Sequence, residues 1–249
     1  MAMAANSSIP MIVSFELQPP VKKVGGSRML AFKRTKAGFR SKVVVSSYSN
    51  NKRILLVGEA DFSFSLSLAT SFESAENMVP TTIDSYDDAI VKHNKAQGNI
   101  ELLKQLGAQV FHGVDATKMA ANLSLPRRMY DRIIFNFPHA GYCGEYEAHP
   151  DMIMSHQRLV RGFLDNAIKM LHPYTGEIHL RHRTQYPFNK WEIIKIAYQC
   201  GLVLIDSRDF NIGDYPGYQN KRGAGSKPDK PFPLESSKTF KFFPLGNSL

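Results

Sequence analysis

The chain has 249 residues, a formal net charge of +9 and 43% hydrophobic residues. This length is typical of one domain with or without tails, and the composition is sufficient for a substantial core. The sequence has no run of 18 apolar residues, which excludes a membrane-spanning helix, and its two cysteines are too few for a disulfide framework.

The positive charge is concentrated in residues 1–49. This segment holds eight Lys or Arg residues and one acid, whereas the other 200 residues hold 23 basic and 21 acidic side chains. Because the segment is rich in Ser, Gly and Pro and lacks a strong period, we expect residues 1–49 to form a disordered basic tail and residues 50–249 to form the domain. Three interpretations of the tail stay open: a solvated extension, an organellar transit peptide, and a nuclear-import or RNA-binding patch.

From residue 52 onward, short apolar segments alternate with segments of helical periodicity. This alternation indicates a doubly wound, mostly parallel sheet. The last two strands have no helix between them and must pair antiparallel, because a parallel pair needs a crossover. We therefore expect an α/β fold with a seven-stranded, mostly parallel sheet and an antiparallel C-terminal hairpin, which is the layout of Rossmann-like methyltransferases. Strands are predicted over residues 53–57, 77–84, 108–115, 130–138, 176–182, 202–210 and 238–243, and helices over 63–72, 87–107 with a bend near Gly98, 152–171 and 190–200.

The loop after the first strand, GEADFSFS, holds the first candidate ligands. In open α/β sheets, ligands bind beyond the carboxyl ends of the strands. Glu59 and Asp61 would repel a pyrophosphate, so the loop favours a cationic ligand such as S-adenosylmethionine, which carries an ammonium and a sulfonium. The alternative is a plain strand-to-helix turn in which Asp61 or Ser63 caps the helix. The predicted cofactor residues here are Gly58, Glu59, Asp61, Phe62 and Ser63.

An acid also follows each of the next two predicted strands. Asp84 is placed to accept hydrogen bonds from both ribose hydroxyls of an adenosine cofactor, or to cap the next helix. Asp115 is placed to accept from the adenine amino group, or to cap a short helix at residues 117–121. Three acidic loops at one sheet edge predict a cofactor site more specifically than any one of these loops does alone.

The loop after the fourth strand reads FNFPHAG over residues 135–141. Amino-group methyltransferases carry an Asn/Asp-Pro-Pro-aromatic tetrad here, and Asn136, Phe137, Pro138 and His139 supply similar groups in another order. A metal is a weaker interpretation of this region. His139, Cys143 and His149 are loosely spaced, whereas a structural zinc site needs four close ligands. No metal is expected.

Five stretches together resemble a known family. ILLVGEADFSFS, TTIDS, GVDAT, YDRIIFNFPHAG and DYPGYQNKRG are similar to the yeast-type large-subunit ribosomal RNA (uridine-N3)-methyltransferases and their plant relatives. The likeness runs from about residue 53 to 243, and Ala60 stands where members usually have glycine. The resemblance implies an enzyme that uses S-adenosylmethionine to methylate N3 of a uridine in ribosomal RNA. It also implies a nucleolar location, with a chloroplast or mitochondrion as the alternative if residues 1–49 are a transit peptide.

For this reaction, the loop after the fourth strand supplies the candidate catalytic residues. His139 is a suitable general base, because imidazole titrates near pH 7. Asn136 is expected to hold a uracil carbonyl or N3–H, and Phe137 or Tyr142 to stack on the base. Catalytic roles are thus predicted for Asn136, Pro138 and His139.

The RNA is expected to contact loops at the same sheet edge. Residues 211–237 form a long loop in which aromatic rings alternate with cations, as suits base stacking and phosphate contact. We expect a monomer with ribosomal RNA as partner and no membrane association. Two rival functions stay open, a non-catalytic binding module on a decayed methyltransferase fold and a small-molecule methyltransferase. The predicted RNA-contacting residues are Phe137, Tyr142, Arg181, Arg183, Tyr215, Tyr218, Lys221 and Arg222.

Overall fold

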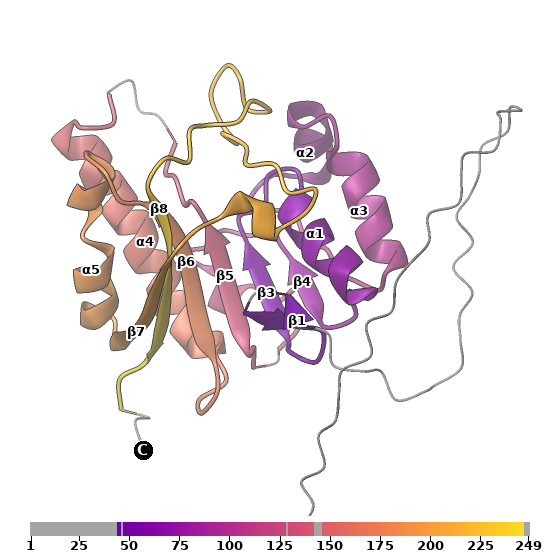
Figure 1. The fold of residues 1–249 in the computed structure, drawn as a ribbon, viewed down its shortest axis with the longest axis horizontal. Coiled ribbons are helices and arrows are strands. Elements are labelled where there is room, and N and C mark those ends of the chain that lie inside the picture. Colours follow the sequence, from indigo (N-terminus) through magenta and orange to yellow (C-terminus); the bar gives the residue numbers. More distant parts are fainter. Residues whose placement is uncertain (1–43, 46, 128, 142–145, 247–249) are drawn as a thin grey trace, which may run out of the picture. The chain divides into compact units, whose positions relative to one another are not determined.

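The sheet at the centre of the domain has six strands in the order β4-β3-β5-β6-β8-β7. The structure is a computed structural model and describes residues 44–45, 47–127, 129–141 and 146–246. Strands β3, β4, β5 and β6 run parallel, and β8 lies antiparallel between β6 and β7 (Figure 1). The strands are β3 (Ile54–Val57), β4 (Met78–Pro80), β5 (Arg132–Asn136), β6 (Glu177–Arg183), β7 (Leu202–Asp209) and β8 (Ser237–Pro244).

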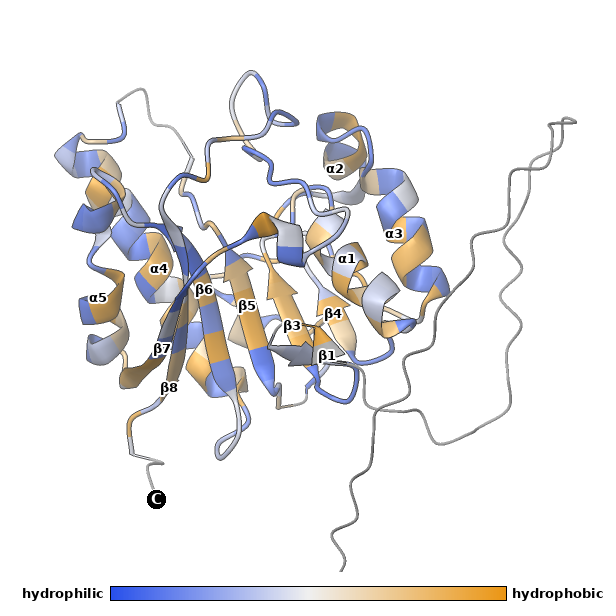
Figure 2. Cartoon of the chain, in the orientation of Figure 1, coloured by the Kyte–Doolittle hydropathy of each residue, from blue (hydrophilic) through white to orange (hydrophobic). Residues whose placement is uncertain are grey.

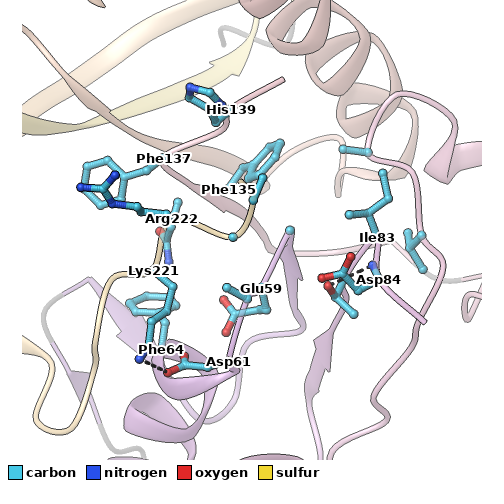
Figure 3. A pocket seen from close by; sticks show the side chains of 18 of the residues that line it. Glu59, Asp61, Phe64, Ile83, Asp84, Phe135, Phe137, His139, Lys221 and Arg222 are labelled. Atoms are coloured by element: carbon cyan, nitrogen blue, oxygen red, sulfur yellow. Dashed lines mark hydrogen bonds and ion pairs between the residues drawn. The ribbon is translucent and has the colours of Figure 1, made fainter. Parts of the chain in front are cut away.

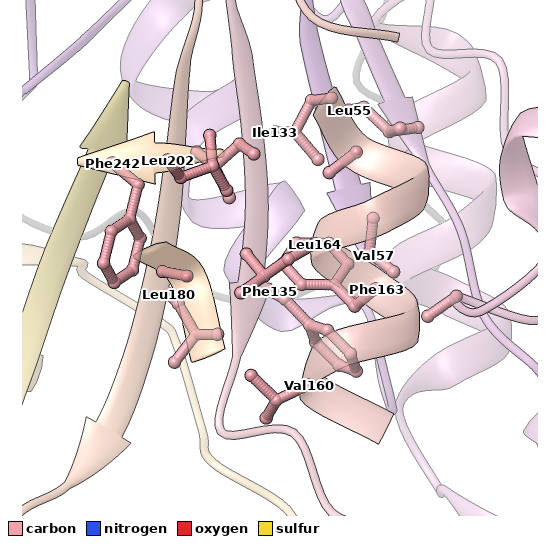
Figure 4. Close-up of a cluster of buried hydrophobic side chains, with 14 of the residues drawn as sticks. Leu55, Val57, Ile133, Phe135, Val160, Phe163, Leu164, Leu180, Leu202 and Phe242 are labelled. Atoms are coloured by element: carbon pink, nitrogen blue, oxygen red, sulfur yellow. The ribbon is translucent and has the colours of Figure 1, made fainter. Parts of the chain in front are cut away.

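Helices cover both faces of this sheet (Figure 1). Successive β3 residues face opposite sides: Ile54 and Leu56 join the core cluster under α1 and α3, whereas Leu55 and Val57 join the cluster against α4 and α5 (Figure 4). All four β3 residues are buried, as expected of a central parallel strand, and hydrophobic colouring runs along β3 and β5 (Figure 2). The helices are α1 (Ser63–Phe72), α2 (Tyr86–Lys92), α3 (Ala96–Gln105), α4 (Pro150–Met170) and α5 (Ile193–Gln199), with short 3-10 turns η1 (Met119–Ala121), η2 (Phe188–Trp191) and η3 (Ile212–Asp214).

The predicted α/β class and antiparallel C-terminal pair are confirmed, but the sheet has six strands because the strand predicted over residues 108–115 is not formed. Residues 108–115 run beside β4 and make a single parallel bridge, between Phe111 and Thr81. Gly113 has φ +67° and turns the chain away before a ladder can continue. This segment therefore ends near the sheet edge without being a full strand.

Two predicted helices also differ in detail. The helix expected over residues 87–107 is two helices, and the break falls at residues 93–95 rather than at Gly98. His93 leaves the helical region with φ −132° and ψ 111°, and its Nδ1 atom lies 3.3 Å from Asp229 in the long loop. The helix expected over residues 190–200 is likewise divided into η2 and α5. No helix in the described part of the chain is long and apolar enough to cross a membrane.

The domain begins earlier than the expected boundary at residue 50. Strands β1 (Val44–Val45) and β2 (Tyr48–Ser49) pair antiparallel, and the Tyr48 side chain is 1% exposed. Tyr48 belongs to the same core cluster as Ile54 and Leu56. Residues 44–49, expected in the tail, therefore contribute to the packing of the domain.

Candidate active site

A cavity opens at the carboxyl ends of β3, β4 and β5, where the predicted ligand loops meet (Figure 3). Asp84 lies on one side of it, and Lys221 and Arg222 of the long loop lie on the other (Figure 3). The carboxyl ends of parallel strands share one edge of the sheet, which is why loops distant in sequence converge here. Of the predicted residues, Gly58, Glu59, Asp61, Asp84, Asp115, Asn136, Phe137, His139, Tyr218, Lys221 and Arg222 line this cavity.

Gly58 is required by both its backbone and its neighbour. Its φ is +68°, a region that favours glycine. A Cβ atom at this position would lie 2.4 Å from the Phe135 ring, which also lines the cavity. Because Gly58 has no side chain, the backbone at the end of β3 packs directly against the Phe135 ring.

Glu59 and Asp61 both accept hydrogen bonds from backbone N–H groups in the first turn of α1. Glu59 Oε2 accepts from the Ser65 N–H at 3.2 Å, and Asp61 Oδ1 accepts from the Ser63 N–H at 2.9 Å. Asp61 Oδ2 is buried and accepts no hydrogen bond from the described residues, with Lys221 Nζ 3.7 Å away. Burial raises the pKa of Glu59 to about 7. The two carboxylates thus form an acidic floor with spare acceptor capacity.

Two residues predicted in this loop support the cavity from outside. Phe62 has φ +61° and is fully buried in the core cluster under α1. The Ser63 hydroxyl donates to the Gln219 carbonyl at 3.2 Å and accepts from the Gln219 N–H at 3.0 Å. Neither residue lines the cavity, and Ser63 holds the long loop against α1.

The pKa of Glu59 predicts a pH dependence of cofactor binding. A cation beside Glu59 favours its ionised form, and below pH 7 that form must first be created by loss of a proton. We expect the affinity for S-adenosylhomocysteine, which keeps the ammonium, to rise by up to about tenfold per pH unit below pH 7 and to level off above it. Calorimetric titration from pH 5.5 to 8.5 measures this, and Glu59→Gln should give a flat profile. A wild-type profile that is also flat would contradict the assignment.

Asp84 and Asp115 were each predicted either to bind the cofactor or to cap a helix, and their contacts differ. Ser85, rather than Asp84, caps α2 by accepting from the Asp88 N–H, so the Asp84 carboxylate faces the cavity with Lys92 as its ion-pair partner. Asp115 lines the cavity but also closes a local turn, because its Oδ1 atom accepts from the N–H and hydroxyl of Thr117 at 2.8 and 2.7 Å; the N-cap of η1 is Lys118. Burial opposes ionisation of Asp115, but the Thr117 hydrogen bonds outweigh it and lower its pKa.

Asn136 is held from behind by a buried arginine. Arg181 is 0% exposed, and its Nη1 donates to Asn136 Oδ1. Its Nη2 donates to the hydroxyls of Tyr48 and Tyr215 at 3.1 and 2.7 Å, and its Cζ lies 4.5 Å from the Phe64 ring centroid. Because guanidinium only donates, the Asn136 oxygen must face Arg181 and its amide N–H groups must face away. Arg181 and Tyr215 were predicted to contact RNA; both are buried and instead support Asn136.

Both ring nitrogens of His139 are engaged. Its Nδ1 accepts from the Gly141 N–H at 3.0 Å, so its proton is on Nε2, which donates to Glu147 at 2.7 Å. His156 is arranged alike, with Nδ1 accepting from the Ala140 N–H and Nε2 3.3 Å from Glu147. Burial opposes ionisation of Glu147, but the two histidines hold its pKa well below its usual range. The geometry does not support His139 as general base.

The same hydrogen bonds argue against a metal ion bound by His139, Glu147 and His156. His139, Glu147 and His156 have ligand atoms within 4.8 Å of one another. A metal would need the Nε2 lone pairs, yet backbone N–H groups hold both Nδ1 atoms as acceptors and leave the protons on Nε2. The cluster therefore braces the loop after β5. Of the earlier metal candidates, His149 caps α4 and Cys143 lies outside the described residues.

The remaining predicted residues lie around the loop after β5. Phe137 has φ +49°, and its ring packs 5.4 Å from the rings of both Phe210 and Phe232. Pro138 and Arg183 line an adjoining cavity, and Tyr142 lies outside the described residues. The predictions omitted Phe135, Thr82, Phe64 and Phe232 of the cavity wall. Phe232 had a usable signal, an aromatic residue between two prolines in a long loop.

The comparisons with known proteins agree with this geometry. A family model described as BMT5-like, "rRNA (uridine-N3-)-methyltransferase BTM5-like", matches residues 55–222. The chain belongs to the BMT5-like family. The resemblance seen in the loops is thereby confirmed, and the BMT5-like chain is an S-adenosylmethionine-dependent methyltransferase.

Relatives of this BMT5-like chain occur in plants and yeast. It is 48% identical over 200 residues to heavy metal-associated isoprenylated plant protein 41 of Arabidopsis thaliana, covering 80% of this chain and 38% of that protein. It is 45% identical over 201 residues to an uncharacterized Arabidopsis thaliana protein, covering 80% and 95%. It is 24% identical over 230 residues to the 25S rRNA (uridine(2634)-N(3))-methyltransferase of Saccharomyces cerevisiae, covering 72% and 68%.

The cavity of the BMT5-like chain fits S-adenosylmethionine. Asp61 Oδ2 is a buried oxygen that accepts no hydrogen bond from the described residues, which suits a cationic donor. The Asp84 carboxylate at the end of β4 suits the ribose hydroxyls.

Proposed function

We propose that this protein methylates N3 of a uridine in large-subunit ribosomal RNA. The observation that carries the proposal is an acid-lined cofactor cavity that shares its wall with a cationic, aromatic loop, in a chain of this family. The yeast relative is named for this reaction, and the family description names the same nucleoside and atom.

The reaction requires an accessible Watson–Crick edge and removal of the N3 proton. A base in a stem must be flipped out, or the enzyme must meet a loop. When bound, S-adenosylmethionine supplies an electrophilic methyl group. Asn136, with its oxygen held by Arg181, donates an amide N–H to a uracil carbonyl oxygen. This donation stabilises the negative charge that gathers on that oxygen as N3 loses its proton to water.

Positioning supplies most of the rate under this proposal. His139, Glu147 and His156 hold the loop after β5 in place. Lys221 is fixed by Asp229 Oδ1 at 2.8 Å, and Arg222 lies beside it at the mouth of the cavity. Arg222 is exposed and available to the phosphate backbone of RNA, and Tyr218 to the base or cofactor. The Lys221 side chain is only 8% exposed and lies between Asp229 and Asp61.

The cellular context follows from the proposed substrate. An enzyme for large-subunit ribosomal RNA is expected in the nucleolus, acting as a monomer on that RNA. A chloroplast or mitochondrial location is the alternative if residues 1–49 act as a transit peptide. Ala60 stands where family members usually have glycine, a departure that would favour the non-catalytic alternative if it strained the cofactor loop. Since Ala60 is not among the residues with positive φ, alanine there brings no backbone strain.

Nucleoside mass spectrometry tests the reaction. Purified protein, S-adenosylmethionine and large-subunit ribosomal RNA should yield N3-methyluridine. Asp84→Ala should abolish most of this product and weaken S-adenosylhomocysteine binding at least tenfold, since hydrogen bonds to a charged group contribute about 1.5–3 kcal/mol. Asp87→Ala, an exposed acid in the first turn of α2, is the matched control. Methylation of small amines but no RNA would contradict the proposal, as would tight NADH binding without S-adenosylhomocysteine binding.

A further inference from the structure

A second cavity adjoins the first on the side of the loop after β5. The two share five lining residues: Phe137, His139, Lys221, Arg222 and Phe232. The second cavity is completed by residues from the end of β6 and from η2, elements that do not touch the cofactor cavity. A ligand in each would therefore meet the other at one common wall, next to Asn136.

The second cavity is aromatic inside and cationic at its rim. Phe188 and Trp191 of η2 line it together with Phe137 and Phe232 of the shared wall. Arg183 packs its guanidinium 4.1 Å from the centroid of the Phe188 ring. The acid that lines this cavity, Glu147, is already engaged by two histidines. Rings with adjacent cations suit a planar base attached to an anionic backbone.

The His182 imidazole in the wall of the second cavity is neutral. His182 is 4% exposed, and burial, its largest influence, lowers its pKa to about 4. Its Nε2 donates to the Phe188 carbonyl at 3.0 Å. His182 therefore adds no positive charge to the interior, and the cations that line this cavity are Arg183, Lys221 and Arg222. Aromatic rings with cations beside them match an uncharged base joined to a phosphate backbone.

We propose that this second cavity receives the target base, a pyrimidine turned out of the RNA, with its reacting edge toward the wall shared with the cofactor cavity. This proposal rests on the proposed function and adds where the substrate binds. Phe188 and Phe232 supply the ring surfaces, and the cations offered to the flanking phosphates are Arg222 and Arg183, the latter already ion-paired with Glu235. Flipping gives the enzyme access to an edge that a duplex hides.

Trp191 makes the proposal directly testable, because it is the only tryptophan in the chain. It lines the second cavity but not the first. With saturating S-adenosylhomocysteine, an octamer of uridylate should change the Trp191 fluorescence. An octamer of abasic ribose phosphate should change it far less, and S-adenosylhomocysteine alone should leave it nearly constant. Equal responses to the uridylate and abasic octamers would overturn the proposal, since only phosphate would then be recognised.

A variant pair tests the same cavity by binding. Phe188→Leu removes a ring surface from the second cavity alone and should weaken uridylate binding about tenfold, with S-adenosylhomocysteine affinity unchanged. Tyr198→Leu, at an exposed aromatic residue on α5, is the matched control and should bind normally. Wild-type binding by Phe188→Leu with an unresponsive Trp191 would overturn the base site. Neither readout requires methyl transfer, so failure of the proposed reaction would be seen separately in the nucleoside assay.

Discussion

Replacing Arg181 with methionine is expected to lower turnover on RNA by about 100-fold while S-adenosylhomocysteine affinity stays within a few fold. Arg181 fixes the Asn136 amide through its oxygen, and a displacement of about 1 Å in a catalytic group can cost about 100-fold in rate. Because Arg181 does not line the cofactor cavity, cofactor binding should be spared. Turnover and calorimetric affinity are measured on the same preparations.

The controls for this variant separate positioning from folding. Methionine replaces a buried charge with a flexible apolar side chain, a change that is often tolerated, but it leaves the Tyr48 and Tyr215 hydroxyls without their donor. Melting temperature is therefore recorded beside activity. Arg208→Met, at an exposed arginine on β7, is the matched control. If Arg181 acts through Asn136, the double variant with Asn136→Ala should be no slower than the slower single variant. Additive losses would show that Arg181 acts by another route.

The ligand loops were predictable because a parallel sheet places all its strand ends at one edge. Gly58, Asp84 and Asn136 each follow an apolar run, and the structure brings all three to one cavity. Local pattern was sufficient for these positions. It was also sufficient for the antiparallel pairing of β7 with β8, since no α-helix separates them.

The supporting residues were not predictable, because their surroundings come from distant segments. Arg181 and Arg183 are two residues apart at the end of one strand, so the sequence pattern places both side chains on the same face. Arg181 is covered by Tyr48 and Tyr215, which lie 133 and 34 residues away, whereas Arg183 contacts Glu235 and the Phe188 ring. Likewise, the sequence predicts that His139 lies just after the strand that ends at residue 138. Its engagement by Glu147 depends on how residues 146–156 fold back.

The segment before residue 50 is expected to contribute strongly to the stability of the domain. Tyr48→Ala is expected to lower the free energy of unfolding by about 3–5 kcal/mol, as is usual for truncating a fully buried aromatic side chain. Tyr48 is 1% exposed, and its hydroxyl meets both Arg181 and, at 2.9 Å, His179 Nδ1. Denaturant unfolding measures the change, with Tyr174→Ala, whose side chain is 75% exposed, as the matched control.

Truncation then locates the true start of the domain. Residues Ser41–Leu249 form one compact unit, so deletion of residues 1–40 should leave the unfolding free energy unchanged. Deletion of residues 1–49 removes Tyr48 and should destabilise at least as much as Tyr48→Ala. Because Tyr48 also holds Arg181, and Arg181 holds Asn136, the longer deletion should slow methyl transfer even below its melting temperature. Equal stability and turnover for the two deletions would show that the hairpin is dispensable, and that Arg181 keeps Asn136 in place without it.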